Sequence, residues 1–402
     1  MSASLSHVGR LENAGLAPGD VVAVALPPGP EWFDLVREVW DVGAALFPVD
    51  TRFPPTEAAA LVRSARPTVL LHPDGWERQD DGMPAETGVA LIVHTSGTAG
   101  VPKLVEFDRD AIDAAVAASA LALEATPHDR WLCALPLAHV GGLLVLLRGV
   151  LLGAPVTVHP GFEATAFAAE RDAVFTSVVP TMLKRLLDAG VDLTRFRAIL
   201  VGGAHLPADL RRRAETTGAR VVETYGLTES CGGVVYDGSP LPSVQVRLDD
   251  DGGIELHGPM VMLGYRFDPA GTQRAFTADG WLRPGDAGRT DPDGRLHVLG
   301  RLDELINSGG EQVWPQEVET ALRDHPKVAE VAVAGRSDPE WGQRVVAFVV
   351  PTDAGDPPSL EELRDIASLH LPRYKAPREL VIVSTLPSAP SGKLRRQALG
   401  QF

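Results

Sequence analysis

The residues best suited to chemistry form the run His94-Thr95-Ser96-Gly97-Thr98-Ala99-Gly100-Val101-Pro102-Lys103, which follows an apolar segment at 89–93. A strand that ends in a loop of glycine, serine and threonine presents backbone N–H groups and hydroxyls to one point. Such a loop can cradle a polyphosphate, because it offers many hydrogen-bond donors and lets the chain approach closely. The run differs from the Walker pattern, since Pro102 precedes its lysine and Leu104 follows it. Taken by itself, a run of this composition is equally compatible with a plain flexible loop.

Four further motifs follow along the chain. They are Tyr225-Gly226-Leu227-Thr228-Glu229, Gly285-Asp286, Gly300-Arg301-Leu302-Asp303 and Pro390-Ser391-Gly392-Lys393. Together with the loop at 94–103, and in this order, they resemble the adenylate-forming superfamily of acyl-CoA synthetases, luciferases and peptide-synthetase adenylation domains. One such motif would be weak, whereas five in the right order indicate the superfamily. The resemblance extends from about Gly19 to the C-terminus.

The resemblance implies a binding site for ATP. The implied contacts are the phosphate cradle of Thr95, Ser96, Gly97, Thr98, Gly100 and Lys103, the adenine-binding residues Gly202, Gly203, Ala204, Tyr225 and Gly226, the ribose ligand Asp286, and Arg301, which contacts ribose or phosphate. An aspartate suits a ribose because its two oxygens can accept from both hydroxyls. The chain departs from the family pattern at Ala99, Leu104 and Pro284, and the hydroxyl missing at position 99 is expected to weaken pyrophosphate handling without abolishing it.

The resemblance also implies the catalytic residues. Glu229 corresponds to the family's Mg²⁺ ligand, which suits a cation that prefers hard oxygen donors, and Thr228 to its phosphate-contacting neighbour. The ammonium of Lys393 would bridge the attacking carboxylate and the α-phosphate; a solvated basic tail is the alternative for this residue. Asp303 corresponds to the hinge about which the C-terminal domain rotates between adenylation and thiol attack. Asn307 stands where a lysine is common.

The segment 136–142 resembles the part of the family fold that separates the acyl pocket from the thiol pocket. His139 is therefore predicted to gate this passage and to contact the substrate, with Gly142 as a further substrate-binding residue. Ala138 replaces a common phenylalanine and leaves a roomier wall. A packed or surface histidine is the alternative interpretation of His139.

Arg148 interrupts an otherwise apolar helix predicted at 141–152. A charge in so apolar a helix must find an anion, because its burial is otherwise costly. The alternatives are an arginine that reaches the surface or that pairs with an acidic neighbour. A basic residue at this distance resembles o-succinylbenzoate–CoA ligases, in which it binds a carboxylate of the substrate. The runs 177–187 and Ser308-Gly309-Gly310-Glu311 fit the same subgroup.

The favoured function is a CoA ligase of menaquinone biosynthesis that converts o-succinylbenzoate, ATP and CoA into o-succinylbenzoyl-CoA, AMP and pyrophosphate. One alternative is an adenylating enzyme for another aryl or acyl acid, with CoA, a carrier-protein pantetheine or an amine as acceptor. A nucleotide-binding homologue without catalysis is a third, against which Lys393, Glu229 and Asp286 argue. The expected partners are a small carboxylic acid, ATP with Mg²⁺, and CoA; a homodimer is one compatible assembly.

The alternation of apolar runs with helical periods over the first two-thirds predicts an α/β protein with layered, largely parallel sheets. After Ser243 the pattern changes to antiparallel strands joined by Asp-Gly turns. We therefore expect a large N-terminal AMP-binding domain at 1–302, which includes a small antiparallel β subdomain, and a small mobile α+β domain at 303–402 that carries the catalytic lysine.

Composition limits the classes of partner. The 402 residues contain 53 acidic and 37 basic side chains, and the net charge of -16 argues against nucleic acid or an anionic membrane. Two cysteines give no disulfide framework and favour a reducing cytoplasm. The first residues lack the pattern of a signal peptide, and the apolar stretch at 140–158 is interrupted by Arg148, Gly153 and Pro155, so no membrane insertion is expected.

Overall fold

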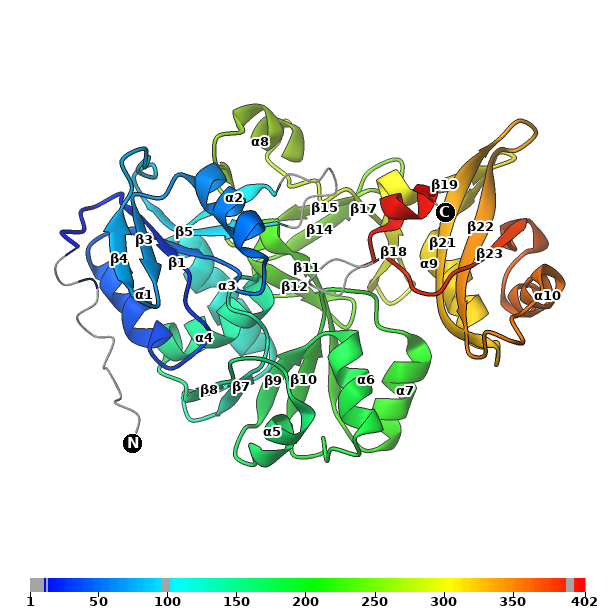
Figure 1. Cartoon of the computed structure of the whole chain (residues 1–402), viewed down its shortest axis with the longest axis horizontal. Helices are drawn as coiled ribbons and strands as arrows, with labels where there is room; N and C mark the ends of the chain where they lie inside the picture. The colour runs from blue at the N-terminus through cyan, green and yellow to red at the C-terminus, as the bar shows by residue number, and fades with distance from the viewer. Residues whose placement is uncertain (1–10, 12–13, 96–101, 388–393, 402) are drawn as a thin grey trace. The chain divides into compact units, whose positions relative to one another are not determined.

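The computed structural model describes residues 11, 14–95, 102–387 and 394–401, and Figure 1 traces the chain. Its contacts divide the chain into two compact units, the first of Met1–Val246 with Leu256–Pro284, and the second of Arg247–Glu255 with Gly285–Phe402. Both units combine helices with sheets, so the predicted α/β class is confirmed. Each unit is described by itself below.

The first sheet of the first unit has seven strands in the order β16-β6-β5-β2-β1-β3-β4. The strands are β1 (Val21–Val24), β2 (Ala45–Pro48), β3 (Val69–His72), β4 (Gly75–Arg78), β5 (Val89–His94), β6 (Leu104–Asp108) and β16 (Gly264–Tyr265). The four middle strands are parallel, and β4, β6 and β16 add antiparallel edges. Strands β1, β2 and β5 are buried along their whole length, as expected for parallel strands covered on both faces.

The second sheet of the same unit has the order β13-β12-β11-β10-β9-β7-β8. The strands are β7 (Trp131–Cys133), β8 (Val156–Val158), β9 (Phe175–Val178), β10 (Ala198–Val201), β11 (Val221–Leu227), β12 (Gly232–Tyr236) and β13 (Ser239–Pro240). The run from β11 to β8 is parallel, so the carboxyl ends of these strands meet at one edge. Loops at such an edge are the usual place for ligand-binding residues in open α/β sheets.

Helices α1, α3 and α4 fill the space between the two sheets (Figure 1). Their bounds are α1 (Trp32–Asp41), α3 (Arg109–Ala122) and α4 (Val140–Leu152), and the outer helices of the unit are α2 (Pro55–Ala65), α5 (Ala164–Ala169), α6 (Pro180–Asp188), α7 (Ala208–Thr216) and α8 (Pro269–Ala275). Helix α3 contacts β5 and β6 of one sheet and β12 of the other, while α4 packs on β7, β8, β9 and β12. This sandwiched position explains why α4 is apolar around most of its circumference.

The strands of the second unit are antiparallel neighbours, except that β23 pairs with β22 in parallel. Its elements are β17 (Asp286–Thr290), β18 (Leu296–Arg301), β19 (Ile306–Ser308), β20 (Glu311–Val313), α9 (Pro315–Arg323), β21 (Val328–Asp338), β22 (Gly342–Pro351), α10 (Leu360–His370) and β23 (Glu379–Ile382). The chain passes into this unit within β14 (Gln245–Leu248) and leaves it again within β15 (Ile254–His257). Side chains of α9 and α10 cover one face of the β19–β23 sheet, and Leu399 packs on the other.

The unit division bears on the predicted hinge. The β17–β18 hairpin belongs by its contacts to the second unit, which resumes at Gly285. Asp303 lies in the short 3₁₀ turn Leu302–Glu304 directly after β18. The boundary at 302/303 as a hinge therefore stays a prediction. Among the described residues, no helix has both the length and the apolar character needed to cross a membrane.

Candidate active site

The two ends of the glycine-rich loop lie side by side. Strands β5 and β6 are antiparallel neighbours with His94 opposite Leu104, and the Thr95 backbone N–H donates to the carbonyl of Lys103 at 2.8 Å. The predicted contacts Ser96, Gly97, Thr98 and Gly100 fall outside the described residues. The loop thus starts and ends at the same point of the first sheet, and the side chain of Lys103 is exposed there.

The predicted adenine-binding residues come together at the carboxyl edge of the second sheet. Gly202 follows β10 directly, and the neighbouring parallel strand β11 carries Tyr225 and Gly226. A Cβ at Gly202 would lie 2.2 Å from Oγ1 of Thr224, so a larger residue cannot occupy this position unless Thr224 moves. Gly203 has φ +78° and Ala204 is exposed, which leaves backbone accessible for a flat ring. This geometry fits the adenine interpretation.

A tight turn after β11 places the predicted catalytic pair. Thr228, Glu229 and Ser230 form one 3₁₀ turn, in which the buried Ser230 hydroxyl accepts from the Leu227 N–H at 3.0 Å and donates to the Gly232 carbonyl at 2.8 Å. A Cβ at Gly226 would fall 1.9 Å from that same carbonyl oxygen. Only glycine therefore allows β11 and β12 to approach closely enough to hold the turn in this form.

Glu229 contacts a residue that the sequence did not single out. The hydroxyl of Tyr265 donates to Oε1 of Glu229 at 2.8 Å, and Nζ of Lys103 lies 4.2 Å from the centroid of the Tyr265 ring. The predicted metal ligand and the predicted phosphate-binding lysine thus meet at one tyrosine, although they come from different sheets. A half-buried carboxylate beside the hydroxyl of Thr228 supplies hard oxygen donors, so these residues fit Mg²⁺.

His139 is the N-cap residue of α4 and belongs to a charged cluster. Its Nε2 lies 3.1 Å from Nη2 of Arg52 and 3.3 Å from Oδ2 of Asp50, and its ring centroid is 5.2 Å from that of His94. Arg52 in turn donates to both oxygens of Asp50, at 2.9 and 2.6 Å. The proton on Nε2 decides the role of His139: without it this nitrogen accepts from Arg52, and with it the nitrogen donates to Asp50.

The electrostatics of this cluster follow from burial. Burial raises the pKa of Asp50, but hydrogen bonds from Arg52 and His139 more than offset this and hold it well below its usual value. Burial, assisted by the charges of His139 and Arg52, lowers the pKa of His94 to about 4. The ligand atoms of Asp50, His94 and His139 lie within 4.8 Å of one another, as in a metal site. Arg52 occupies the Asp50 oxygens, however, so the cluster is an ion-pair network.

Arg148 lies in the interior of the first unit, 3% exposed. Its Nη2 donates to the Ser119 hydroxyl at 2.6 Å, and its guanidinium carbon is 4.2 Å from the centroid of the Trp131 ring. The Ser119 oxygen is 2.8 Å from the Tyr236 hydroxyl. Among the residues that the structure describes, the charged or polar groups that act on Arg148 include no carboxylate, and its Nε is buried without a hydrogen-bond partner.

The predicted residues of the second unit form their own cluster. Asp286 opens β17 opposite Arg301 at the end of β18, and their side chains approach to 3.3 Å. Arg301 also reaches Oδ1 of Asp303 at 3.3 Å. The structure therefore brings together the predicted ribose ligand, its basic neighbour and the predicted hinge residue. Lys393 falls outside the described residues.

Gly142 is buried, and a Cβ there would lie 2.4 Å from the carbonyl oxygen of Pro136. Its predicted contact with the substrate stays a prediction.

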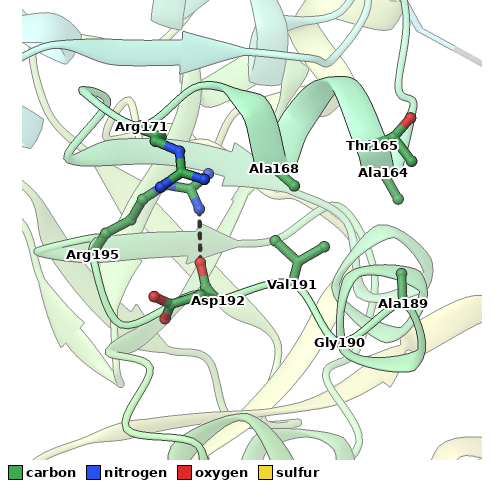
Figure 2. A pocket seen from close by; sticks show the side chains of 9 residues that line it. All are labelled: Ala164, Thr165, Ala168, Arg171, Ala189, Gly190, Val191, Asp192 and Arg195. Carbon is green, nitrogen blue, oxygen red and sulfur yellow. Dashed lines mark hydrogen bonds between the residues drawn. The ribbon is translucent and has the colours of Figure 1, made fainter.

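Figure 2 shows a pocket of about 490 Å³ between α5 and the segment 189–195. Arg195 there donates to the carbonyls of Asp192 and Phe167 at 2.7 and 2.9 Å. This pocket precedes β10, at the edge of the sheet opposite Gly202, and includes no predicted site residue.

Sequence reasoning missed Tyr265, Asp50 and Arg52. Asp50 follows the buried strand β2 after a single residue, a position at a strand's carboxyl end that could have marked it. Tyr265 offered no such signal, because its importance rests on contacts with Lys103 and Glu229, which are distant in sequence.

The fold and this site together define an adenylate-forming enzyme. The family model described as AMP-binding enzyme matches residues 8–85 and 72–266, and the model of the AMP-binding enzyme C-terminal domain matches residues 317–393. The chain therefore belongs to the AMP-binding enzyme family, and the superfamily prediction is confirmed.

Several of the individual proteins that the chain resembles are 2-succinylbenzoate–CoA ligases. It is 34% identical to a 2-succinylbenzoate–CoA ligase of Bacillus velezensis, over all of this chain and 91% of the relative. It is 40% identical to a probable 2-succinylbenzoate–CoA ligase of Mycobacterium tuberculosis, over 79% of this chain and 85% of the relative. Two solved structures of o-succinylbenzoate CoA synthetase (MenE) from Bacillus subtilis, one with the acyl-adenylate intermediate and one with ATP and magnesium, match with TM-scores of 0.87 at 30% and 29% identity, over 98% of this chain and 90% and 92% of theirs.

Proposed function

We propose that this chain converts 2-succinylbenzoate, ATP and CoA into 2-succinylbenzoyl-CoA, AMP and pyrophosphate, in the menaquinone pathway that the resemblance implies. The observation that carries the substrate assignment is the buried guanidinium of Arg148, which has hydroxyl and aromatic neighbours but no carboxylate partner among the described residues. The similarity to 2-succinylbenzoate–CoA ligases supports the same acid. The substrate is a dicarboxylate, so one carboxylate can be activated while the other binds a cation.

Arg148 and His139 belong to the same helix. His139 caps α4, and Arg148 lies nine residues further along, about 13 Å by the rise of a helix and about half a turn around it from His139. Between them, Leu144 of α4 packs against Gly232, which follows the Glu229 turn: a Cβ on Gly232 would lie 2.6 Å from Cδ1 of Leu144. The face of α4 therefore runs from the adenylation residues to Arg148. We assign the carboxylate that is not activated to Arg148.

In the first half-reaction the substrate carboxylate attacks the α-phosphate of ATP and expels pyrophosphate. Because both reactants are anions, the site must neutralise charge and align them. Thr95 and Lys103 hold the leaving phosphates, while Thr228 contacts phosphate and Glu229 holds Mg²⁺. Mg²⁺ supplies charge neutralisation at the phosphates when bound. Lys393 stabilises the charge that develops between carboxylate and α-phosphate.

The remaining roles concern the nucleotide and the second half-reaction. Gly202, Gly203, Ala204, Tyr225 and Gly226 form the adenine site, and Asp286 with Arg301 binds the ribose. After pyrophosphate leaves, rotation at Asp303 removes Lys393 and admits the pantetheine thiol past His139 and Gly142. The thiol attacks the acyl carbon, AMP leaves, and the thiol proton is released to solvent or to a nearby base.

We further propose that the protein works in the cytoplasm. Both cysteines, Cys133 and Cys231, are buried and unpaired, and burial raises the pKa of each thiol to about 12. Thiols held in this protonated, inaccessible form agree with a reducing compartment. The sequence is also compatible with a homodimer, and sedimentation of the purified protein measures whether one forms.

The test is mass detection of the products that purified protein makes from Mg-ATP, CoA and 2-succinylbenzoate. We expect a CoA thioester and an equal amount of AMP. Formation of acyl-AMP without thioester would support 2-succinylbenzoate as the acid and would assign a carrier-protein thiol or an amine as the acceptor. No product with this acid, but turnover of another aryl or fatty acid, would overturn the substrate assignment and leave the family membership intact.

A further inference from the structure

We propose that Tyr265 is a positioning residue of the adenylation site, which fixes the carboxylate of Glu229 through its hydroxyl and the ammonium of Lys103 through its ring. The proposal rests on the proposed function, in which these two side chains serve Mg²⁺ and phosphate. It adds one residue to the site and gives its two groups different roles. The hydroxyl orients the carboxylate that binds the metal, and the ring restrains the ammonium of the lysine.

Tyr265 is 8% exposed, and a buried phenol requires a hydrogen-bond acceptor that any nearby carbonyl could supply. The acceptor is Oε1 of Glu229, at 2.8 Å. A hydrogen bond to one carboxylate oxygen fixes the side-chain torsions of Glu229 and directs the second oxygen. A preorganised oxygen of this kind binds a cation without first losing rotamer freedom.

The ring of Tyr265 contacts the predicted phosphate-binding lysine. The Lys103 ammonium lies 4.2 Å from the centroid of the Tyr265 ring, within the range of a cation–π contact. Lysine has a long flexible side chain, and Lys103 is exposed, so without a fixed contact its ammonium would sample many positions. The ring restricts these positions while leaving the three N–H donors available for phosphate oxygens.

The backbone holds Tyr265 between the two sheets. The N–H of Met262 donates to the carbonyl of Glu229, the N–H of Leu263 to that of Glu106, and the N–H of Arg266 to that of Leu104, at 2.9, 2.9 and 2.8 Å. The segment 262–266 is thus bonded on one side to the Glu229 turn and on the other to β6, next to Lys103. It sets the spacing between two site residues that belong to different sheets.

The first test replaces Tyr265 by phenylalanine, which keeps the ring and removes the hydroxyl. Electron paramagnetic resonance measures the dissociation constant of Mn²⁺ in a mixture of enzyme, a non-hydrolysable ATP analogue and the metal. We expect this constant to rise about tenfold, because the loss of one hydrogen bond to a charged group has an effect of this size. The Mg²⁺ concentration for half-maximal ATP–pyrophosphate exchange should rise in parallel, with the KM for acid and CoA unchanged. Tyr374→Phe, an exposed tyrosine of the second unit, is the matched control.

A second variant separates the two roles. Tyr265→Leu removes ring and hydroxyl, and should add an increase in the KM for ATP that Tyr265→Phe does not show. If Tyr265→Leu fails to fold, a double-mutant cycle of Tyr265→Phe, Glu229→Gln and the double variant still tests the proposal. Direct coupling makes the effect of the double variant on Mn²⁺ binding smaller than the sum of the two single effects. Unchanged Mn²⁺ binding in Tyr265→Phe, or additive effects in the cycle, would overturn the proposal. Failure of the proposed function is distinct, because the unmodified enzyme would then make no product from 2-succinylbenzoate.

Discussion

At the scale of single residues, Arg148 and His94 are both buried ionisable groups, but burial leaves His94 uncharged whereas Arg148 keeps its charge. Burial lowers the pKa of His94 to about 4, so this side chain is uncharged near neutral pH. A guanidinium cannot escape burial in this way, because it stays protonated at any physiological pH. Arg148 instead keeps its charge, with partial compensation from the Ser119 hydroxyl and the Trp131 ring. A buried cation held so weakly by its own protein is suited to an anionic ligand.

We predict that Arg148→Met separates stability from substrate binding. Methionine keeps much of the volume and removes the charge, so the free energy of unfolding should be unchanged or raised by up to about 3 kcal/mol. The KM for 2-succinylbenzoate should rise about ten- to a hundredfold, with the KM for ATP nearly constant. Denaturant unfolding and steady-state kinetics measure the two quantities. A destabilised variant with an unchanged KM for the acid would assign Arg148 to folding alone.

We predict that His94 makes stability fall in mild acid. Its pKa is about 4 in the folded state, against the ordinary histidine value of 6.5 in the unfolded chain, so between these values only the unfolded chain binds the proton. Stability from this group is therefore complete above pH 6.5 and is lost as the pH falls toward 4; between pH 7 and 5 the loss is on the order of 2 kcal/mol. His94→Phe should flatten the dependence of unfolding free energy on pH over this range. The same slope in both proteins would contradict the assignment.

At the scale of elements, the turn between β11 and β12 determines where the predicted metal ligand lies. Glu229 is placed by the close approach of these strands at Gly226 and Gly232 and by the internal hydrogen bonds of Ser230. The parallel sheet contributes the edge, and its antiparallel neighbour closes the turn. A small change in the spacing of β11 and β12 is therefore expected to displace Glu229 and to impair adenylation.

We predict that Gly226→Ala impairs adenylation through this turn. The added Cβ would lie 1.9 Å from the Gly232 carbonyl oxygen, which is backbone and cannot rotate away. The free energy of unfolding should fall by about 1–3 kcal/mol, and ATP–pyrophosphate exchange should fall more steeply than the fraction of folded protein. The matched control is Gly161→Ala, where nothing lies within 4 Å of the new Cβ. Full exchange activity in the folded Gly226→Ala protein would show that the turn tolerates displacement.

At the scale of the whole molecule, the chain divides its site residues between two compact units. The first holds Thr95, Lys103, the adenine edge and Glu229, and the second holds Asp286, Arg301 and Asp303. The second unit also contains the stretch of chain that includes Lys393. Two half-reactions with different requirements are compatible with such a division, because each can use a different arrangement of the units.

We predict that Lys393→Ala affects only one half-reaction. ATP-dependent formation of acyl-AMP should fall at least about a hundredfold, the usual effect of removing one preorganised charge at a developing anion. Conversion of pre-made 2-succinylbenzoyl-AMP and CoA into thioester should be largely preserved. Rapid-quench assays of the separate half-reactions measure both rates. Equal loss in the two would exclude a lysine that acts in adenylation alone.

Much of the fold and of the chemical inventory followed from the sequence. The strand runs at 89–93 and 198–201, the helix at 141–152 and the antiparallel segments after Ser243 correspond to β5, β10, α4 and the β14–β15 hairpin. Such elements are readable because hydrophobic spacing and turn residues act locally. The family was equally readable, because its motifs are short runs in a fixed order.

Other features depended on the tertiary structure. Arg52 and His139 are 87 residues apart in the chain, and Glu229 and Tyr265 are 36 apart, so no local pattern connects either pair. The sequence placed Arg148 in an apolar helix, but only the packing of α3, α4, β7 and β12 decides that its neighbours are hydroxyls and an aromatic ring. The residue types and their order thus determined which chemistry is available. Contacts between elements distant in the chain, formed when two sheets bury a common layer of helices, decided which of those residues meet.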